Sequence, residues 1–253
     1  MKNWYIVQSH SSFENKVAGL IKEEAEKAKI SDKFDEIIVP THDITEVKRG
    51  KRVQRKKKFF PGYVLIKIDL TKELSIILAR DFSGNIVSYP VAENYHKKGI
   101  LDTSIMPGNV SQSVKDQIFQ FAVKIIQHMN YCGVLCVEFF LSGNKTYVNE
   151  LAPRPHNSGH QTIEACKCSQ FEQQVRISTS MSLGSTDMNY SAITKNLMGD
   201  LWFEDLESEK IVEPNWELYK KSGLTIYLYG KKTPKVGRKM GHTTEIFSKN
   251  ANF

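Results

Sequence analysis

Two neighbouring stretches decide the fold of this chain. They are residues 133–140, Gly-Val-Leu-Cys-Val-Glu-Phe-Phe, and residues 150–160, Glu-Leu-Ala-Pro-Arg-Pro-His-Asn-Ser-Gly-His. The first stretch is an apolar run with one carboxylate, Glu138, inside it. Residues 142–145 are turn formers, and residues 146–150 have the composition of a second strand. The pattern predicts a β-hairpin across residues 133–150.

The hairpin predicts that Glu138 and Glu150 face each other. The midpoint of their positions is residue 144, inside the turn, so both carboxylates fall on the same side of the sheet. Facing partners lie roughly 5 Å apart, and like charges there destabilise the pair. The pair therefore indicates a bridging hard cation, with Mg2+ fitting best because it takes one or two carboxylates plus phosphate and water. The alternative is a solvated hairpin with two incidental acids.

The residues that follow favour a site over that alternative. Shortly after Glu150 the chain carries side chains that bind anions or transfer protons. These are Arg154, His156, Asn157 and His160.

Composition is that of an ordinary globular protein. The chain has 253 residues, of which 40% are hydrophobic and 25% charged, enough for one large or two modest domains. No run reaches the roughly 18 apolar residues that a membrane span requires, and the N-terminus lacks the pattern of a signal peptide. We expect a cytoplasmic protein without membrane contact, whose four cysteines are reduced.

Positive charge is concentrated in residues 48–58, where eight of eleven residues are basic and none is acidic; the whole chain carries a net charge of +7. Such a run attracts phosphate backbones. No aromatic residue interrupts it, which argues against a base-stacking platform. The alternative is a mobile, solvated loop.

The remaining patterns predict an α+β fold. The expected strands are 3–8, 36–40, 64–68, 74–80, 86–90, 192–201 and 225–229, and the expected helices are 13–29, 111–130, 159–168 and one within 171–190. Residues 93–103 are expected to be irregular. The helix at 159–168 would direct its positive N-terminal end at the site, which suits an anion.

Residues 2–70 resemble the N-terminal domain of the NusG family of transcription elongation factors. The resemblance rests on residues 3–9, on Val39-Pro40-Thr41 and on residues 59–65, Phe-Phe-Pro-Gly-Tyr-Val-Leu. It implies an apolar surface that contacts RNA polymerase, with Phe59, Phe60 and Tyr63 at or near that contact and the basic run close to nucleic acid. The alternative for these three aromatic residues is core packing.

Residues 72–245 resemble the C-terminal part of the carboxyaminoimidazole ribonucleotide synthases, ATP-grasp ligases of purine biosynthesis. The resemblance rests on residues 72–80, 89–94, 133–140, 149–160 and 237–242. It implies that ATP phosphorylates bicarbonate and that the resulting carboxyphosphate carboxylates aminoimidazole ribonucleotide.

The same resemblance implies roles for individual residues. Glu138 and Glu150 would bind Mg2+ on the ATP phosphates. Arg154, His156, Asn157 and His160 would be the catalytic residues that line the bicarbonate and nucleotide pocket. The ribonucleotide phosphate would be bound by Lys231, Arg238 and Lys239, for which a basic surface turn is the alternative.

Taken together, the sequence predicts a chimera of three parts. These are a truncated NusG-like unit at 1–70, a partial ATP-grasp domain at 72–182 and a small β-rich C-terminal domain at 183–253. The sequence contains no glycine-rich phosphate loop, so we expect a ligase fragment that is inactive alone; its relatives imply a homodimer. Two alternatives are an RNA polymerase-binding module with a passenger C-terminal part and a chimera without function.

Overall fold

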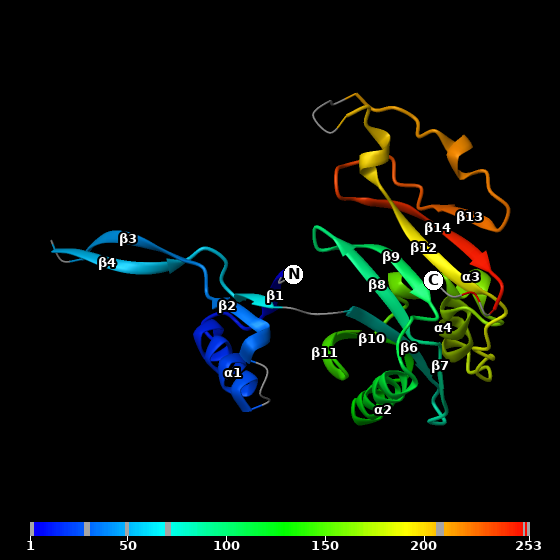
Figure 1. The fold of residues 1–253 in the computed structure, drawn as a ribbon, viewed down its shortest axis with the longest axis horizontal. Coiled ribbons are helices and arrows are strands. Elements are labelled where there is room, and N and C mark those ends of the chain that lie inside the picture. The colour runs from blue at the N-terminus through cyan, green and yellow to red at the C-terminus, as the bar shows by residue number, and fades with distance from the viewer. Residues whose placement is uncertain are drawn as a thin grey trace. The chain divides into compact units, whose positions relative to one another are not determined.

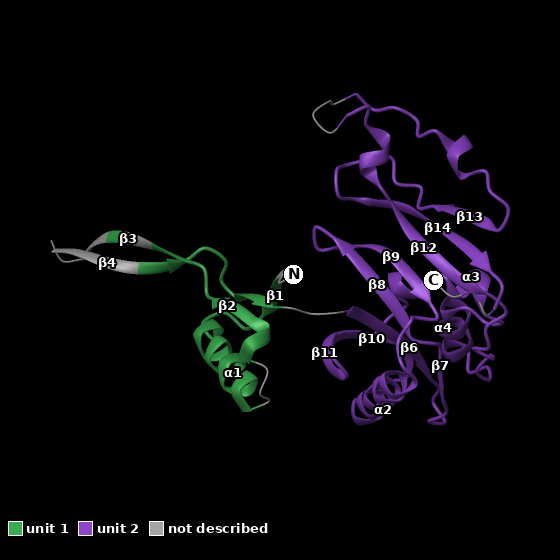
Figure 2. Cartoon of the chain, in the orientation of Figure 1, with its two compact units in different colours: residues 1–71 green, residues 72–253 purple. Residues whose placement is uncertain are grey.

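The computed structural model describes residues 3–27, 31–48, 51–68, 72–205, 210–249 and 251. It divides the chain into two compact units, residues 1–71 and 72–253, which Figure 2 shows in different colours. The division falls where the sequence changes character. Each unit is described by itself below.

Unit 1 is a small sheet with one helix. Strands β1 (Asn3–Gln8), β5 (Tyr63–Ile68) and β2 (Phe34–Ile38) pair antiparallel in the order β1-β5-β2. Helix α1 (Glu14–Lys27) packs against this sheet, and the short helix η1 (Ser31–Lys33) precedes β2. The buried carboxylate of Glu14 accepts a 2.6 Å hydrogen bond from the Gly62 N–H and pairs with Lys58, so the start of the helix is tied to the loop before β5.

The basic run forms strand where we expected a loop. Strands β3 (Thr41–Lys48) and β4 (Lys51–Lys58) pair antiparallel as a separate two-stranded sheet; residues 49–50 of the run lie outside the described residues. The lysine-rich composition hid the β-branched residues of this hairpin, among them Thr45 and Val47, which precede the run on β3, and Val53 within it on β4. Such residues favour an extended backbone even in a strongly charged strand.

Unit 2 is built on a nine-stranded antiparallel sheet (Figure 1). Its strands are β6 (Lys72–Arg80), β7 (Ile86–Ser88), β8 (Ala92–Lys97), β9 (Ile100–Met106), β10 (Gly133–Ser142), β11 (Lys145–Ala152), β12 (Ser191–Met198), β13 (Leu224–Leu228) and β14 (Lys239–Phe247). The order is β11-β10-β6-β8-β9-β12-β14-β13, with β7 beside β6. Strand β12 pairs with both β9 and β14. A single sheet therefore contains strands from both of the domains that we predicted at 72–182 and 183–253.

Helices cover both faces of this sheet. Helix α2 (Gln112–His128), capped by Ser111, packs on the face formed by Leu74, Ile76 and Leu78 together with alternate residues of β10. Helices α3 (Thr162–Ala165) and α4 (Gln170–Ser178) lie on the opposite face with Ile77 and Ala79. Successive side chains of β6 point to opposite faces of the sheet. Because helices cover both faces, the side chains on both sides of this strand are buried. Three single-turn helices complete the unit: η2 (Asn157–Gly159), η3 (Gly199–Trp202) and η4 (Trp216–Tyr219).

Two of our secondary-structure predictions for unit 2 are wrong. Residues 93–103, expected to be irregular, form most of the β8–β9 hairpin. Lys98 and Gly99 at its turn have φ values of 51° and 75°, as a two-residue turn of type I′ requires. The expected helix at 159–168 is reduced to η2 and the four-residue α3, which is too short for a helix dipole of the expected strength.

The α+β class with mostly antiparallel sheet is confirmed. The four cysteines are free thiols. Among the described residues, no helix is long and apolar enough to cross a membrane.

Candidate active site

Glu138 and Glu150 face each other across β10 and β11, as predicted. The turn is tighter than we expected, because Ser142 pairs directly with Lys145. A regular hairpin closed by this turn would pair Glu138 with Asn149. Instead the register shifts between Phe139, which pairs with Val148, and Glu138, which pairs with Glu150. Asn149 is the extra residue of a β-bulge, and the bulge brings the two acids opposite each other.

The two carboxyl groups have different surroundings. The side chain of Glu138 is 14% exposed, whereas Glu150 is exposed. Burial, and then the neighbouring charge of Glu150, raises the pKa of Glu138. Asn149 Nδ2 donates a 3.4 Å hydrogen bond to Glu138 Oε2. A cation bound between the carboxylates would relieve their repulsion, and a donor set made of oxygen atoms suits Mg2+.

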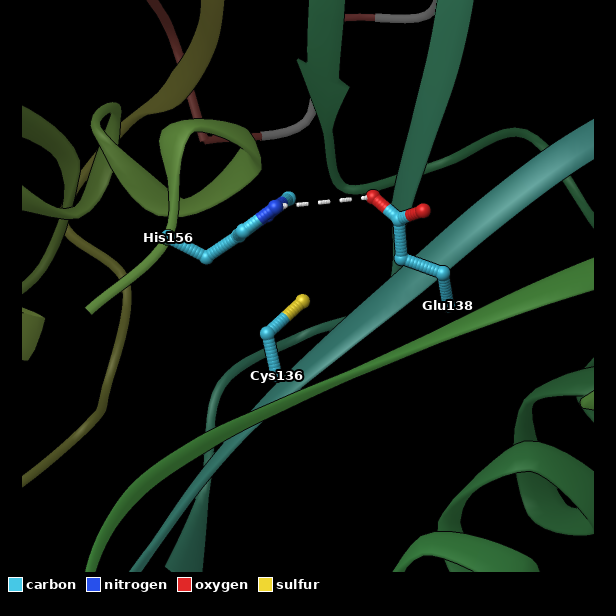
Figure 3. Close-up of side chains that lie close together, drawn as sticks. All are labelled: Cys136, Glu138 and His156. Carbon is cyan, nitrogen blue, oxygen red and sulfur yellow. Dashed lines mark ion pairs between the residues drawn. The ribbon is translucent and has the colours of Figure 1, made fainter. Parts of the chain in front are cut away.

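His156 lies beside this pair. Its Nε2 is 3.7 Å from Glu138 Oε1, the contact drawn as a dashed line in Figure 3. Its Nδ1 lies 2.8 Å from Ser158 Oγ and accepts a 3.3 Å hydrogen bond from the Ser158 N–H. Burial lowers the pKa of His156 to about 4, so the ring is neutral at pH 7. It acts there as a hydrogen-bonding group and not as a charged partner of Glu138.

Cys136 completes a cluster with Glu138 and His156, in which one ligand atom from each residue lies within 4.8 Å of the others (Figure 3). Metal binding by cysteine requires the thiolate. Burial raises the pKa of the Cys136 thiol well above its ordinary value, so the sulfur keeps its proton. The cluster therefore lacks the donor set of a zinc site, and Glu150 is the better second ligand for a cation at Glu138.

Asn157 connects the 156–160 segment to the C-terminal strands. Its amide exchanges hydrogen bonds of 3.0 and 2.6 Å with the amide of Asn196 on β12, and its Oδ1 accepts a 3.2 Å bond from Lys239 Nζ on β14. Asn157 Nδ2 lies 3.2 Å from His160 Nδ1. Burial lowers the pKa of His160 to about 3. Asn157 and His160 thus hold the segment in place as uncharged groups.

The predicted basic residues separate into two groups. Burial lowers the pKa of Lys239, and the charges of Arg154 and Lys231 lower it further, so these three cations act on one another. Lys231 Nζ donates to the Lys239 carbonyl and lies 5.4 Å from the centroid of the Tyr229 ring.

Arg238, in contrast, donates a 2.8 Å hydrogen bond to the Thr233 carbonyl within its own turn. The guanidinium of Arg154 is exposed and donates to the Pro155 carbonyl at 3.0 Å.

Sequence reasoning missed several groups of this site. Glu73 on β6 and His96 on β8 are in close contact, and both affect the pKa of Glu138. Asn196, Tyr229 and the 3% exposed His242 lie around His160. Strand alternation could have placed Glu73 on the same face as Ser75. His96 was hidden because its strand was interpreted as irregular.

Phe59, Phe60 and Tyr63 belong to unit 1. Their exposed fractions of 58%, 58% and 37% exclude core packing within that unit. Contact with RNA polymerase stays a prediction.

Comparison with known proteins identifies the class. The family model of the ATP-grasp domain matches residues 41–171, and that of the phosphoribosylaminoimidazole carboxylase C-terminal domain matches residues 192–252. The chain belongs to the ATP-grasp family.

More specific similarity comes from curated relatives. The chain is 43% identical over 178 residues to the N5-carboxyaminoimidazole ribonucleotide synthase of Bacillus subtilis (strain 168), an alignment that covers 70% of the chain and 44% of that enzyme. It is 41% identical over 180 residues to the enzyme of the same name from Brucella melitensis, which covers 71% of the chain and 47% of the relative. The chain thus spans less than half the length of these relatives.

Solved structures of proteins with similar names are also similar to this chain. The N5-carboxyaminoimidazole ribonucleotide synthetase of Thermus thermophilus superposes with a TM-score of 0.67 at 28% identity, covering 96% of this chain and 62% of that one. The Staphylococcus aureus synthetase complexed with ADP gives a TM-score of 0.65 at 27% identity, covering 98% and 63%.

These findings confirm the resemblance to the synthases and give no support to a NusG-like module or a chimera. The ATP-grasp match begins at residue 41, inside the region that we compared with NusG. The superpositions cover nearly the whole chain.

Proposed function

We propose that unit 2 carries the magnesium and ribonucleotide half of the active site of an N5-carboxyaminoimidazole ribonucleotide synthase in purine biosynthesis. The observation that carries the proposal is the pair of facing acids, Glu138 and Glu150, beside the neutral His156. The ATP-grasp family model covers residues 41–171, which include these three residues, and a relative bearing that name aligns with 70% of the chain.

The acids are proposed to bind Mg2+ together with the phosphates of ATP. Bound there, the ion would neutralise charge that develops during phosphoryl transfer. Glu138 supplies the buried ligand and Glu150 the exposed one. The raised pKa of Glu138 means that cation binding and loss of a proton from this carboxyl are linked.

In the proposed reaction, an oxygen of bicarbonate attacks the γ-phosphorus of ATP, and ADP leaves. The carboxyphosphate then releases phosphate and carbon dioxide, and the exocyclic amine of aminoimidazole ribonucleotide attacks the carbon and loses a proton. Arg154 offers a fixed positive charge to the anions of the first step. His156, neutral and buried, offers a hydrogen bond without adding charge.

Lys239 and Lys231 are proposed to bind the ribonucleotide phosphate. Lys239 is half-buried and joined to Asn157, and its lowered pKa reflects burial and two neighbouring cations. A bound phosphate would add its negative charge to that of Glu138, which already acts to raise the pKa of Lys239. Arg238 is proposed to stabilise its turn, since its guanidinium already binds the Thr233 carbonyl.

Calorimetric titration with aminoimidazole ribonucleotide tests these assignments. We expect Lys239→Ala to lower affinity by about 1.5–3 kcal/mol, or roughly ten- to a hundredfold, as for other hydrogen bonds to charged groups. Arg238→Ala should have a much smaller effect, and Lys232→Ala, which removes a neighbouring exposed lysine, serves as the matched control. Equal losses in all three variants would indicate a general charge effect and would contradict the proposed site.

Turnover is a further part of the proposal. The chain spans less than half of its relatives and its sequence has no glycine-rich phosphate loop, so we propose that it needs the other half of an ATP-grasp site for catalysis. The homodimer implied by the relatives is likewise a proposal.

A further inference from the structure

A continuous row of buried hydrogen bonds ends at His156. It begins at Gln161, whose Nε2 donates to the Ser158 carbonyl at 2.7 Å and to Ser104 Oγ at 3.2 Å. Ser104 Oγ donates to Asn94 Oδ1 at 2.8 Å, and Asn94 Nδ2 donates to Ser75 Oγ at 3.0 Å. All four side chains are at most 5% exposed, so water does not compete for these bonds.

The row continues through two serines to the imidazole. Ser75 Oγ donates to Ser158 Oγ at 2.9 Å, and Ser158 Oγ lies 2.8 Å from His156 Nδ1. Each hydroxyl has one proton to donate. Asn94 Nδ2 can only donate, so Ser75 Oγ accepts from it and donates its own proton to Ser158 Oγ. Ser158 Oγ also lies 3.7 Å from Cys136 Sγ, but His156 Nδ1 is the nearer acceptor at 2.8 Å, so the Ser158 proton is directed at that nitrogen.

The backbone supports the same direction independently. The Ser158 N–H, which can only donate, lies 3.3 Å from His156 Nδ1. Two donors therefore converge on one ring nitrogen, which must be the unprotonated one in a neutral imidazole. The proton then lies on Nε2, the atom 3.7 Å from Glu138 Oε1.

We infer that Ser158 is a positioning residue that keeps the proton of His156 on Nε2 and directs that N–H at the Glu138 side of the site. In this state Nε2 cannot bind a metal ion, and it can donate to a carboxylate, phosphate or bicarbonate oxygen. The catalytic use of this donor rests on the proposed function, whereas the position of the proton does not.

Several charged groups act on this ring. Glu138 approaches from β10, Lys239 acts from β14, His96 from β8, and Arg154 from the adjoining loop. The cations and burial disfavour the imidazolium. The two hydrogen bonds donated to Nδ1 also favour the ring that carries its proton on Nε2.

The experiment is nuclear magnetic resonance of the purified, ligand-free chain labelled with 15N histidine, in which the imidazole nitrogens report the tautomer. His156→Gln identifies the signal. We expect His156 in the wild-type chain to carry its proton on Nε2. Ser158→Ala should shift the ring towards a mixture of tautomers, Ser158→Thr should restore the wild-type tautomer, and Ser178→Ala on the exposed end of α4 should leave it unchanged.

Two results would overturn the inference. One is a wild-type ring protonated on Nδ1, a measurement that remains decisive even if Ser158→Ala does not fold. The other is a folded Ser158→Ala chain with an unchanged tautomer. Because no nucleotide or metal is added, failure here is distinguishable from failure of the proposed function, which ribonucleotide binding tests separately.

Discussion

Burial divides the roles of the two facing acids at the residue scale. Glu138 lies in an apolar strand, where desolvation and Glu150 both raise its pKa, while Glu150 remains exposed. A pair of this kind is unfavourable when both groups are charged and no cation is present. The proposed cation site would therefore lower stability locally when it is empty.

Replacing either acid tests this view. We predict that Glu138→Gln and Glu150→Gln each weaken Mg2+ binding by at least about tenfold, since even supporting residues of metal sites contribute that much. Calorimetry, or Mn2+ paramagnetic resonance as a substitute, measures the effect. Glu217→Gln, at an exposed position, is the control. Unchanged Mg2+ affinity in both site variants would show that the two acids face each other without forming a metal site.

The neutral histidines predict a pH dependence of stability. The pKa values of His160 and His242 in the folded chain are about 3 and about 4, lowered by burial from 6.5. Between these values and 6.5 the unfolded chain binds more protons, so the free energy of unfolding falls as the pH falls through this window. Each histidine contributes up to about 1.4 kcal/mol per pH unit.

Urea denaturation between about pH 7 and about pH 5 measures that slope. We expect His160→Gln to make the free energy of unfolding depend less steeply on pH, because one group that binds a proton on unfolding is removed. The exposed His128→Gln should leave the slope as in the wild-type chain. A slope unaffected by His160→Gln would show that this residue does not lose protons on folding.

At the scale of elements, the β-bulge at Asn149 sets the register of the site. Our sequence prediction of the facing acids was correct in outcome but assumed a regular hairpin with a longer turn. The actual turn is tighter, and the bulge compensates by one residue. Register follows from turn geometry and bulges together, and a single sequence does not reveal a bulge that lacks glycine.

The bulge allows a sharp test. Deletion of Asn149 would leave a regular hairpin that still pairs Glu138 with Glu150, so we predict that Mg2+ binding is retained within severalfold. Insertion of one alanine after Asn149 should weaken binding as much as Glu150→Gln, because a one-residue slip turns the carboxylate to the other face. Loss of binding in the deletion variant, with its fold intact by circular dichroism, would contradict this account.

Other elements show where sequence patterns fail. Helix α2 and strands β1, β6 and β10 were predictable because their apolar periodicity is strong. The β8–β9 hairpin was not, because its polar residues break the apolar alternation: Asn94 and Ser104 face a buried polar cluster, and His96 contacts Glu73. The residues that obscure the strand are therefore the ones that build the site.

For the whole molecule, the sequence motifs identified the ligase family correctly, and the structure brings Glu138, Glu150 and His156 together. They could not show that Arg238 is occupied by its own turn, or that Glu73 and His242 join the site, because these contacts bring distant strands together. The N-terminal comparison with NusG received no support, and ATP-grasp similarity begins at residue 41.

Phosphate release from ATP, measured with Mg2+, bicarbonate and aminoimidazole ribonucleotide, tests the central claim most directly. The assay compares the 253-residue chain alone with the chain mixed with the N-terminal half of the Bacillus subtilis synthase, its 43% identical relative. We predict no release by the chain alone, release that depends on the ribonucleotide in the mixture, and loss of that release with Glu138→Gln. Robust turnover by the chain alone would contradict the proposed need for a second half. A folded mixture that remains silent, or one that is insensitive to Glu138→Gln, would contradict the proposed site.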